Sequence, residues 1–434
     1  MPAPAILRTV MTLAMVAFAC AQVNAGEALI PGWARDAAIQ LCTAAGTAPR
    51  PDHDAVAAMT GAAPDSVAIL TDDDTAFAAA ILRDGQEVEI SIVSPGTPQS
   101  RTQLLSLSAQ AAGAPSRQLY MLQANAACVF ELGRAVQYDE NRVPVSLHHY
   151  GAELVQGDVE QLNPDVPSGM DPGGVAVAHV DTGVAYTLPH IAARLARSEG
   201  GGLLGADLAD DDGKPFDLDP QSGPLFPRRH GTAVASILLQ EAPDARLIEY
   251  RYPGSDWPRF GTLVTMIAAG PARIVAMPLG SNRKSHWDAF AQAARQHDEL
   301  LFIVSAGNDG VDIDHAPVYP ATLDLDNFLV VTSVDAFGRL ANRSNWGPAS
   351  VDIAVPAEDL PVIDHRGAQV TASGSSYAVP RVAAFAARLL AMHPDWTAQQ
   401  LRSAIIAQAH PLPRGQAGLI RHGWLADPSR APVD

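Results

Sequence analysis

Short apolar runs alternate with amphipathic stretches along the C-terminal part of the chain. Nearly continuous apolar runs, rich in β-branched residues, occupy residues 174–181, 246–252, 273–279, 300–308 and 328–335. Such runs are typical of parallel strands that helices cover on both faces. Helical patterns follow at residues 230–242, 287–297 and 381–396. The alternation predicts a doubly wound, mostly parallel α/β domain.

The N-terminal part shows a different pattern. Val88, Ile90 and Ile92 alternate with polar residues, which predicts a strand with one exposed face. Residues 99–112 have helical character, and residues 118–132 favour extended chain. We therefore expect a small α/β N-terminal domain over residues 26–165.

Proline, glycine and aspartate concentrate in residues 161–174, which is the composition of a linker. We place the boundary between the two domains in this segment. The doubly wound domain is then expected over residues 166–428, with a short tail at 429–434.

The first 25 residues have the pattern of a secretory signal peptide. Arg8 precedes an apolar run at residues 10–21, and small residues follow up to Ala25. The run is too short for a stable membrane anchor. We expect export to the periplasm or the extracellular space, and a lipid-modified Cys20 is the alternative interpretation.

Removal of the signal peptide leaves two cysteines, Cys42 and Cys128. In an oxidising compartment, a lone pair within one domain is most simply a disulfide. The alternative is a pair of buried thiols.

The formal net charge of −18 comes without any basic block. This composition argues against broad electrostatic attraction to nucleic acid or to anionic lipid. An acidic loop at residues 205–220 could bind calcium, but Leu208 stands where an EF-hand loop needs its first aspartate. We expect a solvated loop, and the alternative calcium ligands are Asp207, Asp210, Asp212, Asp217 and Asp219.

Polar residues follow the predicted strands and begin the predicted helices. Asp181 and Asn308 end apolar runs, while His230 and Ser376 begin helical stretches. Ligands of doubly wound sheets bind beyond the carboxyl ends of the strands, so we expect these side chains to meet there.

These residue types suit acyl transfer. Serine needs a base to take its proton, and the base needs a third group to orient it. Ser376, His230 and Asp181 could fill these roles. The side chain of Asn308 and the main-chain N–H of Ser376 could bind the oxyanion of a tetrahedral intermediate.

The motifs "DTG", "HGT", "AGN" and "GSSYAVP" occur in this order at residues 181, 230, 306 and 374. Together they resemble the subtilisin-like serine proteases, the subtilases, over roughly residues 170–428. The resemblance implies a subtilisin-like fold and a serine endopeptidase that acts on proteins or peptides and needs no cofactor for its chemistry. It identifies Ser376, the third residue of "GSS", as the nucleophile. The substrate-binding residues that it implies are Leu279, Gly280, Ser281, Ser305, Ala306 and Gly307.

The chain also departs from the family pattern. Ser375 replaces the usual threonine, Ala233 replaces the histidine after "HGT", and Pro278 removes one N–H from the substrate-binding strand. The N-terminal domain resembles a propeptide in position, so it is expected to act in cis on the peptidase domain. The alternative function is a catalytically silent binding or scaffolding protein on a subtilase frame.

Overall fold

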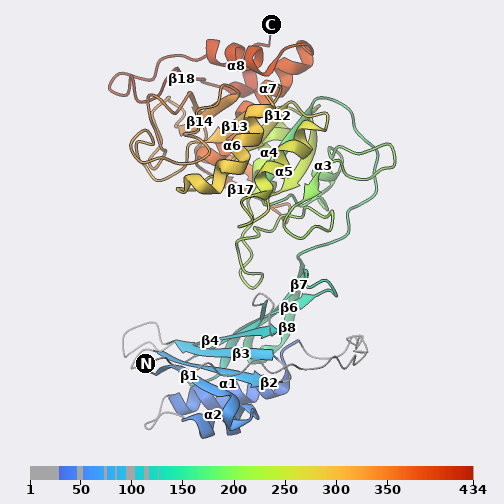
Figure 1. Ribbon diagram of the computed structural model, residues 1–434, viewed down its shortest axis with the longest axis vertical. Coiled ribbons are helices and arrows are strands. Elements are labelled where there is room, and N and C mark those ends of the chain that lie inside the picture. Colours follow the sequence, from blue (N-terminus) through green and yellow to red (C-terminus); the bar gives the residue numbers. More distant parts are fainter. Residues whose placement is uncertain are drawn as a thin grey trace, which may run out of the picture.

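The computed structural model describes residues 29–45, 52–72, 76–83, 86–93, 103–111, 117–125 and 127–433. The expected signal peptide, Cys20 and the last residue of the tail lie outside the described residues. The described chain forms two parts that are stacked along the long axis of the molecule (Figure 1).

The N-terminal part is an antiparallel sheet with strands in sequential order. Its strands are β1 (Val67–Asp72), β2 (Ala76–Arg83), β3 (Gln86–Val93), β4 (Gln103–Ala111), β5 (Arg117–Ala124), β6 (Phe130–Tyr138), β7 (Pro144–Tyr150) and β8 (Gln156–Gln161). Helices α1 (Gly32–Ala45) and α2 (His53–Thr60) lie against the face of the sheet that points away from the C-terminal part (Figure 1). The alternation in β3 is confirmed, because Val88 and Ile90 are buried and Glu89 is exposed.

The helix expected at residues 99–112 is wrong in its described portion, which is strand β4. Leu105 and Leu107 alternate with serines, and this period of two matches a strand better than a helix. Strand β4 pairs with β3 on one side and with β5 on the other, so Leu107 lies opposite both Ile90 and Tyr120. Pairing on both edges outweighs the weak helical propensity of the segment.

Cys128, in the turn between β5 and β6, is disulfide-bonded. The side chain of Cys42, its predicted partner, lies outside the described side chains. The predicted pairing therefore stays a prediction.

The C-terminal part contains a sheet in which every neighbouring pair is parallel, as expected. The strand order is β10-β11-β9-β12-β13-β14-β15-β18. The bounds are β9 (Ala176–Asp181), β10 (Ala206–Asp207), β11 (Arg246–Arg251), β12 (Ile274–Met277), β13 (Leu301–Ser305), β14 (Phe328–Val334), β15 (Ile353–Pro356) and β18 (Gly423–Trp424).

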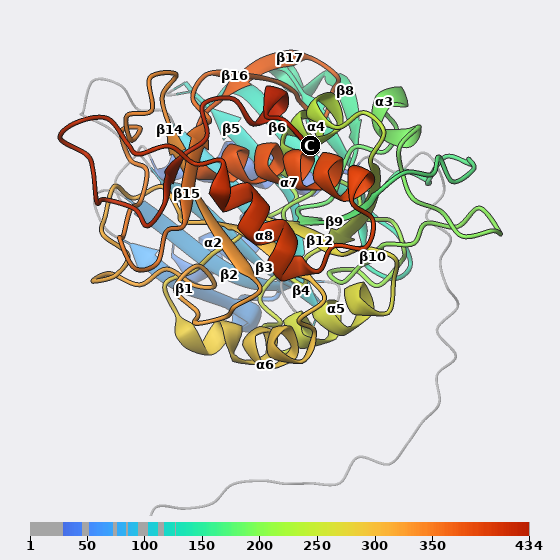
Figure 2. The same ribbon diagram turned by 90° about the horizontal axis from the view of Figure 1, so that it is seen from above.

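Helices cover both faces of this sheet (Figure 2). The helices are α3 (Pro189–Ala192), α4 (Gly231–Glu241), α5 (Arg259–Ala268), α6 (Asp288–Gln296), α7 (Ser375–Met392) and α8 (Ala398–Ala407). Helices α4, α7 and α8 share one apolar core with alternate strand residues such as Val177, and α5 and α6 share the other with residues such as Ala178. Burial on both faces explains why the strands are apolar throughout.

The strands that follow β9 in the sequence are added to the sheet on opposite sides of it. Strand β11 pairs on one side of β9 and β12 on the other, so the carboxyl end of β9 is a topological switch point. A two-stranded hairpin, β16 (Leu360–Ile363) and β17 (Gln369–Ala372), bonds to α4 through the N–H of Ile363 and the hydroxyl of Ser236, and it leads into α7. This edge of the sheet is where a ligand site is expected.

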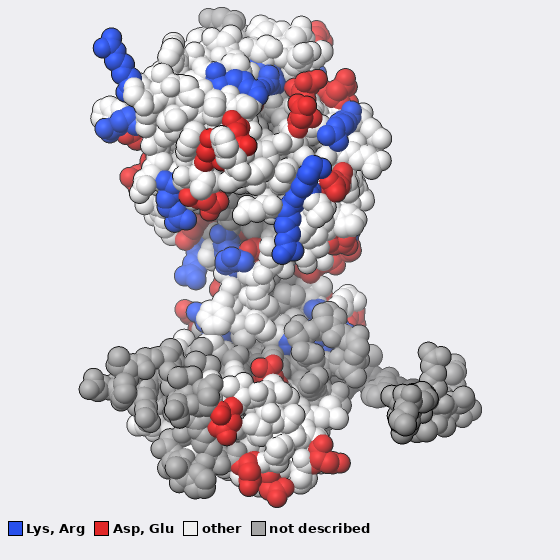
Figure 3. Space-filling view, turned by 60° about the vertical axis from the view of Figure 1, so that its left-hand side comes forward, with Lys and Arg blue, Asp and Glu red and all other residues white. Residues whose placement is uncertain are grey.

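The two parts meet through a small apolar cluster. Met121, Val136 and Leu147 of the N-terminal sheet pack against Leu218 and Leu225 of the C-terminal part. On the face drawn in Figure 3, side chains of both signs are interspersed over the C-terminal part. Within the described ranges, none of the helices combines the length and apolar character that a bilayer crossing needs.

Candidate active site

Asp181 is the last residue of β9, and it is completely buried. Its carboxylate accepts the main-chain N–H of Thr182 at 2.7 Å. The chain then turns sharply at Gly183, whose φ is +95°, and a Cβ atom there would lie 2.3 Å from the carbonyl oxygen of Phe216. Only glycine fits this turn, which holds the carboxylate at the edge of the sheet.

His230 stands at the N-cap position of α4 and faces Asp181. Its Nδ1 lies 2.8 Å from both carboxylate oxygens of Asp181. Burial opposes charge on both groups, but their mutual attraction is stronger: the pKa of His230 is raised and that of Asp181 is lowered. The side chain of His230 is 28% exposed, so the other ring nitrogen is available to a reactant.

Asp217 fixes the start of α4. The side chain of His230 does not cap its own helix. Instead, the buried carboxylate of Asp217 accepts the main-chain N–H groups of His230, at 3.1 Å, and of Thr232, at 3.0 Å. The hydroxyl of Thr182 also donates to this carboxylate, at 2.6 Å. The sequence suggests Asp217 only as a calcium ligand, because nothing in its local sequence reveals its contact with a helix that begins fourteen residues later.

Ser376 is half-buried in the first turn of α7, as expected. The N-cap residue is Gly374, with φ at +126°, and a Cβ atom there would lie 2.9 Å from Oδ1 of Asn308. The neighbouring Ser375 is fully buried, and its hydroxyl accepts the N–H of Gly307 at 3.1 Å. Of the two adjacent serines, Ser376 is therefore the accessible one.

Asn308 lies against the start of the same helix. Its Oδ1 accepts the main-chain N–H of Ser375 at 2.8 Å, which leaves the amide N–H groups of Asn308 for another acceptor. The main-chain N–H of Ser376 is one of the first-turn donors that have no acceptor within the helix. The amide of Asn308 and the main-chain N–H of Ser376 are thus two hydrogen-bond donors at the start of α7.

The start of α7 also lies beside His230. The ring centroids of His230 and Tyr377 are 5.7 Å apart. Within the described part of the chain, no hydrogen bond joins the Ser376 hydroxyl to the imidazole, a contact that often tightens only when substrate binds. The structure thus brings Asp181 and His230 into direct contact and places the segment of Ser376 next to them.

The expected substrate-binding segment follows β12. Ser281 exchanges both main-chain hydrogen bonds with Tyr319, each at 2.8 Å. The main-chain groups of Leu279 and Gly280 make no main-chain hydrogen bond within the described ranges, and Gly280 is exposed. This short edge is open to an extended chain.

The second expected segment, residues 305–307, lies deeper. Ser305 and Ala306 are buried, and the N–H of Ala306 donates to Val331 at 2.9 Å. Gly307 has φ at +99° and leads directly into Asn308. Its role in the structure is to position that asparagine.

The five candidate calcium ligands do not converge on one point. Each of them bonds to a neighbouring group: Asp207 and Asp210 to Arg251, Asp212 to Asn163, Asp217 to Thr182, and Asp219 to Tyr252. Among the residues that the structure describes, no three histidine, cysteine or carboxylate side chains are grouped as metal ligands would be.

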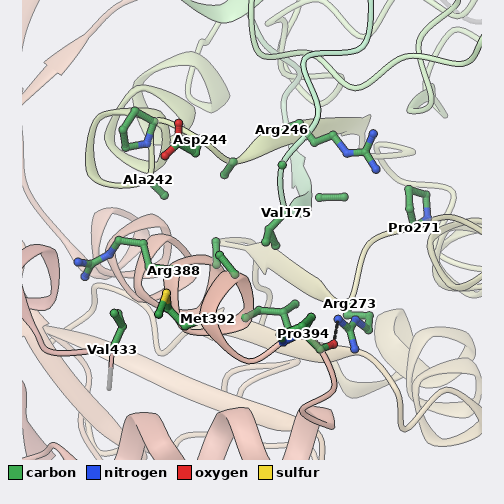
Figure 4. Close-up of a pocket in the computed structure, with 17 residues that line it drawn as sticks. Val175, Ala242, Asp244, Arg246, Pro271, Arg273, Arg388, Met392, Pro394 and Val433 are labelled. Atoms are coloured by element: carbon green, nitrogen blue, oxygen red, sulfur yellow. Dashed lines mark hydrogen bonds between the residues drawn. The ribbon is translucent and has the colours of Figure 1, made fainter.

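A cavity of about 680 Å³ lies beside the start of β11 and the end of α7 (Figure 4). Its walls include Val175 before β9, Ala242 and Arg246 near the start of β11, and Met392 at the end of α7. These positions surround the amino ends of the strands, whereas Asp181 stands at a carboxyl end. The cavity is therefore separate from the candidate active site.

Comparison with known proteins gives a family match over the same region. The model of the subtilase family, Peptidase_S8, matches residues 173–424. A thermophilic serine proteinase of Bacillus sp. strain AK1 is 29% identical over 234 residues, which are 50% of this chain and 52% of that protein. Alkaline serine exoprotease A of Vibrio alginolyticus is 27% identical over 268 residues, or 57% of this chain and 44% of that protein.

Among solved structures, a cold-adapted subtilisin-like serine proteinase gives a TM-score of 0.49 at 22% identity. That match covers 62% of this chain and 94% of the other. The chain spans about half the length of the two relatives named above. Because the family match covers more than half of its residues, this chain belongs to the subtilase family.

Proposed function

We propose that this protein is an exported serine endopeptidase that hydrolyses peptide bonds with Ser376, His230 and Asp181. The observation that carries the proposal is the double contact between His230 and Asp181 at 2.8 Å, directly beside the first turn of α7. Membership of the subtilase family supports the same reaction class.

In the first half of the proposed reaction, Ser376 Oγ attacks the carbonyl carbon of the scissile peptide bond. His230 Nε2 takes the hydroxyl proton, and the buried carboxylate of Asp181 stabilises the imidazolium. The carbon–nitrogen bond then breaks, and His230 gives its proton to the leaving amine. The product is an acyl ester on Ser376.

In the second half, water attacks the acyl carbon while His230 takes one of its protons. The ester bond breaks, the carboxylic acid leaves, and the proton returns to Ser376. The oxyanion formed in each half accepts hydrogen bonds from the Asn308 amide and from the main-chain N–H of Ser376. The support is that Asn308 Oδ1 is already held by Ser375, which fixes the orientation of its amide.

We propose that the substrate binds as an extended chain along residues 279–280, directly before Ser281, whose main-chain groups already pair with Tyr319. Main-chain groups at a free edge give affinity without selecting side chains, and pockets beside them give specificity. Residues 305–307 would form the opposite wall. Pro278 has no main-chain N–H, so this edge offers one donor fewer, and we expect only a few main-chain hydrogen bonds to the substrate.

The N-terminal sheet is proposed to act in cis on the peptidase domain. Arg134 donates to the carbonyl of Leu225 at 2.7 Å, and Glu160 of β8 accepts from Arg229 at 2.5 Å. Arg229 directly precedes His230 in the chain, so contacts from the N-terminal sheet reach the segment that carries the proposed base. These contacts would hold that segment in place.

The proposed chemistry uses protein groups alone, without a cofactor. For the acidic loop we propose a solvated segment, and a structural calcium ion is the alternative. Treatment with EGTA followed by thermal unfolding tests it, and we expect neither activity nor the unfolding midpoint to change. A lower midpoint that calcium restores would show a bound ion.

A peptide library tests the proposed activity. The full chain should release internal peptide fragments, and Ser376→Ala should abolish the release, while Ser373→Ala, an exposed serine three residues earlier, should retain it. A chain that folds but cleaves nothing in the library would support the scaffolding alternative.

A further inference from the structure

A second histidine lies behind the proposed catalytic aspartate. His179 precedes Asp181 by two residues in β9, so both side chains point to the same face of the sheet. That face otherwise packs apolar residues such as Val177 against α4 and α7. A buried imidazole at this position is unusual, because burying a polar side chain costs free energy unless it is paired.

The partner of His179 comes from the neighbouring strand. Strands β9 and β11 pair in a parallel register that places Glu249 beside His179. The Nδ1 atom of His179 lies 2.7 Å from Oε2 of Glu249, and both side chains are completely buried. The two residues are 70 positions apart, so the pair exists only in the folded sheet.

The other ring nitrogen of His179 faces Asp181. His179 Nε2 lies 3.6 Å from Oδ2 of Asp181, and it has no hydrogen-bond partner among the described residues. Oδ2 of the same carboxylate also contacts Nδ1 of His230 at 2.8 Å. The carboxylate of Asp181 is therefore placed between two imidazoles.

The protonation of His179 and Glu249 depends on the charged groups around them. Glu249 faces it from β11, Asp181 from its own strand, Asp217 from the segment before α4, and His230 from the start of α4. Burial opposes the charged form of His179, but the attraction of Glu249 and Asp181 raises its pKa, while burial raises the pKa of Glu249 to about 7. Both shifts favour one proton on the pair in addition to the hydrogen that the neutral imidazole ring already carries.

Both placements of that proton have the same consequence at Asp181. If the proton is on His179, both ring nitrogens carry hydrogen; if it is on Glu249, Nδ1 accepts from the carboxylic acid and Nε2 carries the ring hydrogen. In each case Nε2, which lies 3.6 Å from Oδ2 of Asp181, carries a hydrogen. If Nε2 carried no hydrogen, its lone pair would instead face the negatively charged carboxylate of Asp181 in a buried site, which is unfavourable.

We propose that His179, held by Glu249, is a positioning residue that presents Nε2–H to the back of Asp181 and limits how strongly Asp181 raises the basicity of His230. This inference rests on the proposed function, since it gives His230 the role of general base. The His179–Glu249 pair holds the Asp181 carboxylate in place and offsets part of its negative charge. His230 then stays neutral, and able to accept a proton, at lower pH than it would beside Asp181 alone.

The variant His179→Gln removes the imidazole and keeps an amide that can bond to Glu249. The acid limb of the kcat/KM profile should move to higher pH, so that activity at about pH 5.5 falls several-fold relative to activity at about pH 8. Val177→Ala is the matched control, because Val177 is equally buried on the same face of β9 and carries no charge. It should lower stability and leave the shape of the profile unchanged.

A readout without catalysis separates this inference from the proposed function. In the full-length Ser376→Ala protein, ¹⁵N NMR should show His179 Nε2 protonated at neutral pH. The titration of His230 should move to higher pH when His179→Gln is added. If the His230 titration shifts but the protein with Ser376 intact has no peptidase activity, the positioning role is supported and the proposed function is contradicted.

The opposite results overturn the inference. A bare Nε2 on His179 at neutral pH would refute it, and this measurement needs no substitution at His179. An unchanged His230 titration in folded His179→Gln protein would refute it as well, even if peptide hydrolysis is confirmed. If His179→Gln does not fold, the ¹⁵N spectrum of His179 decides alone.

Discussion

The carboxylate of Asp217 lies under the start of α4, where it accepts the main-chain N–H of His230 at 3.1 Å. It also accepts the N–H of Thr232 and the hydroxyl of Thr182. Together with the Thr182 hydroxyl, which accepts the N–H of Gly231 at 2.9 Å, this buried side chain replaces the missing helix cap and joins the turn after Asp181 to the helix that begins at His230.

Replacing Asp217 should loosen the active site. Asp217→Ala leaves the N–H of Thr232 and the hydroxyl of Thr182 unpaired in a buried site, each costing roughly 1–3 kcal/mol, so we expect the free energy of unfolding to fall by about 3 kcal/mol or more. Urea denaturation measures this loss. Asp219→Ala, in the same segment but without a contact to α4, is the control and should cost clearly less.

The acid limb of the activity profile should report on His230. Asp181 raises the pKa of His230, so the imidazolium persists above its ordinary value of about 6.5 and blocks general-base action there. We expect kcat/KM to rise with pH through a midpoint above about 6.5. A midpoint at or below that value would show that the pair does not act as described.

The same pair makes a pH-dependent contribution to stability. The folded pKa of His230 is raised, so its contribution is complete below the unfolded value of about 6.5 and is lost as the pH rises through the folded value. His230→Gln should therefore destabilise the protein more at about pH 6 than at about pH 9. Chemical denaturation at both pH values measures the difference, and equal losses would contradict the expectation.

Asn308 offers a test of the oxyanion donor. Asn308→Ala should lower kcat by ~10²–10³-fold, which is the loss known for such a donor in subtilisin, itself a member of this family, rather than one calculated from this structure. Because Asn308 Oδ1 also accepts from Ser375, alanine will cost stability too. Asn308→Asp keeps that acceptor and removes the donor, so it should retain stability and lose activity.

Glu160 contributes to the contact between the two parts of the chain through its bond to Arg229. Burial disfavours its charge, but the nearby side chains of His365, whose Nε2 lies 3.4 Å from Oε1 of Glu160, and of Arg229 lower the pKa of Glu160 to about 2. The contribution is therefore complete above the ordinary value of about 4.5 and is lost as the pH falls toward 2. Glu160→Gln should increase hydrogen exchange in residues 216–229 at about pH 7 and have little effect near pH 2. Unchanged exchange at pH 7 would show that Glu160 does not hold this segment.

Much of the C-terminal part could be predicted from the sequence because its signals are local. The strand that ends at Asp181 is continuously apolar, and the helix starts at His230 and Gly374 carry small or polar residues. The role of Asp217 and the pairing of His179 with Glu249 could not be predicted, since they depend on strand register and on segments far apart in the chain.

The N-terminal part shows where local patterns mislead. Residues 103–111 contain leucine, glutamine and alanine, which favour a helix, yet their alternation with serine matches the strand that they form. The local pattern does not predict helix α5 either, because its start follows a segment rich in proline and glycine that resembles a loop. Tertiary pairing decided the first case, and packing of an apolar face decided the second.

The most direct measurement is active-site labelling with a fluorophosphonate, followed by mass spectrometry of the modified peptide. The account predicts a single phosphonyl group on Ser376, none on the buried Ser375 or on Ser373, and loss of labelling in His230→Ala. Labelling at another residue, or labelling of Ser376 that persists without His230, would contradict it.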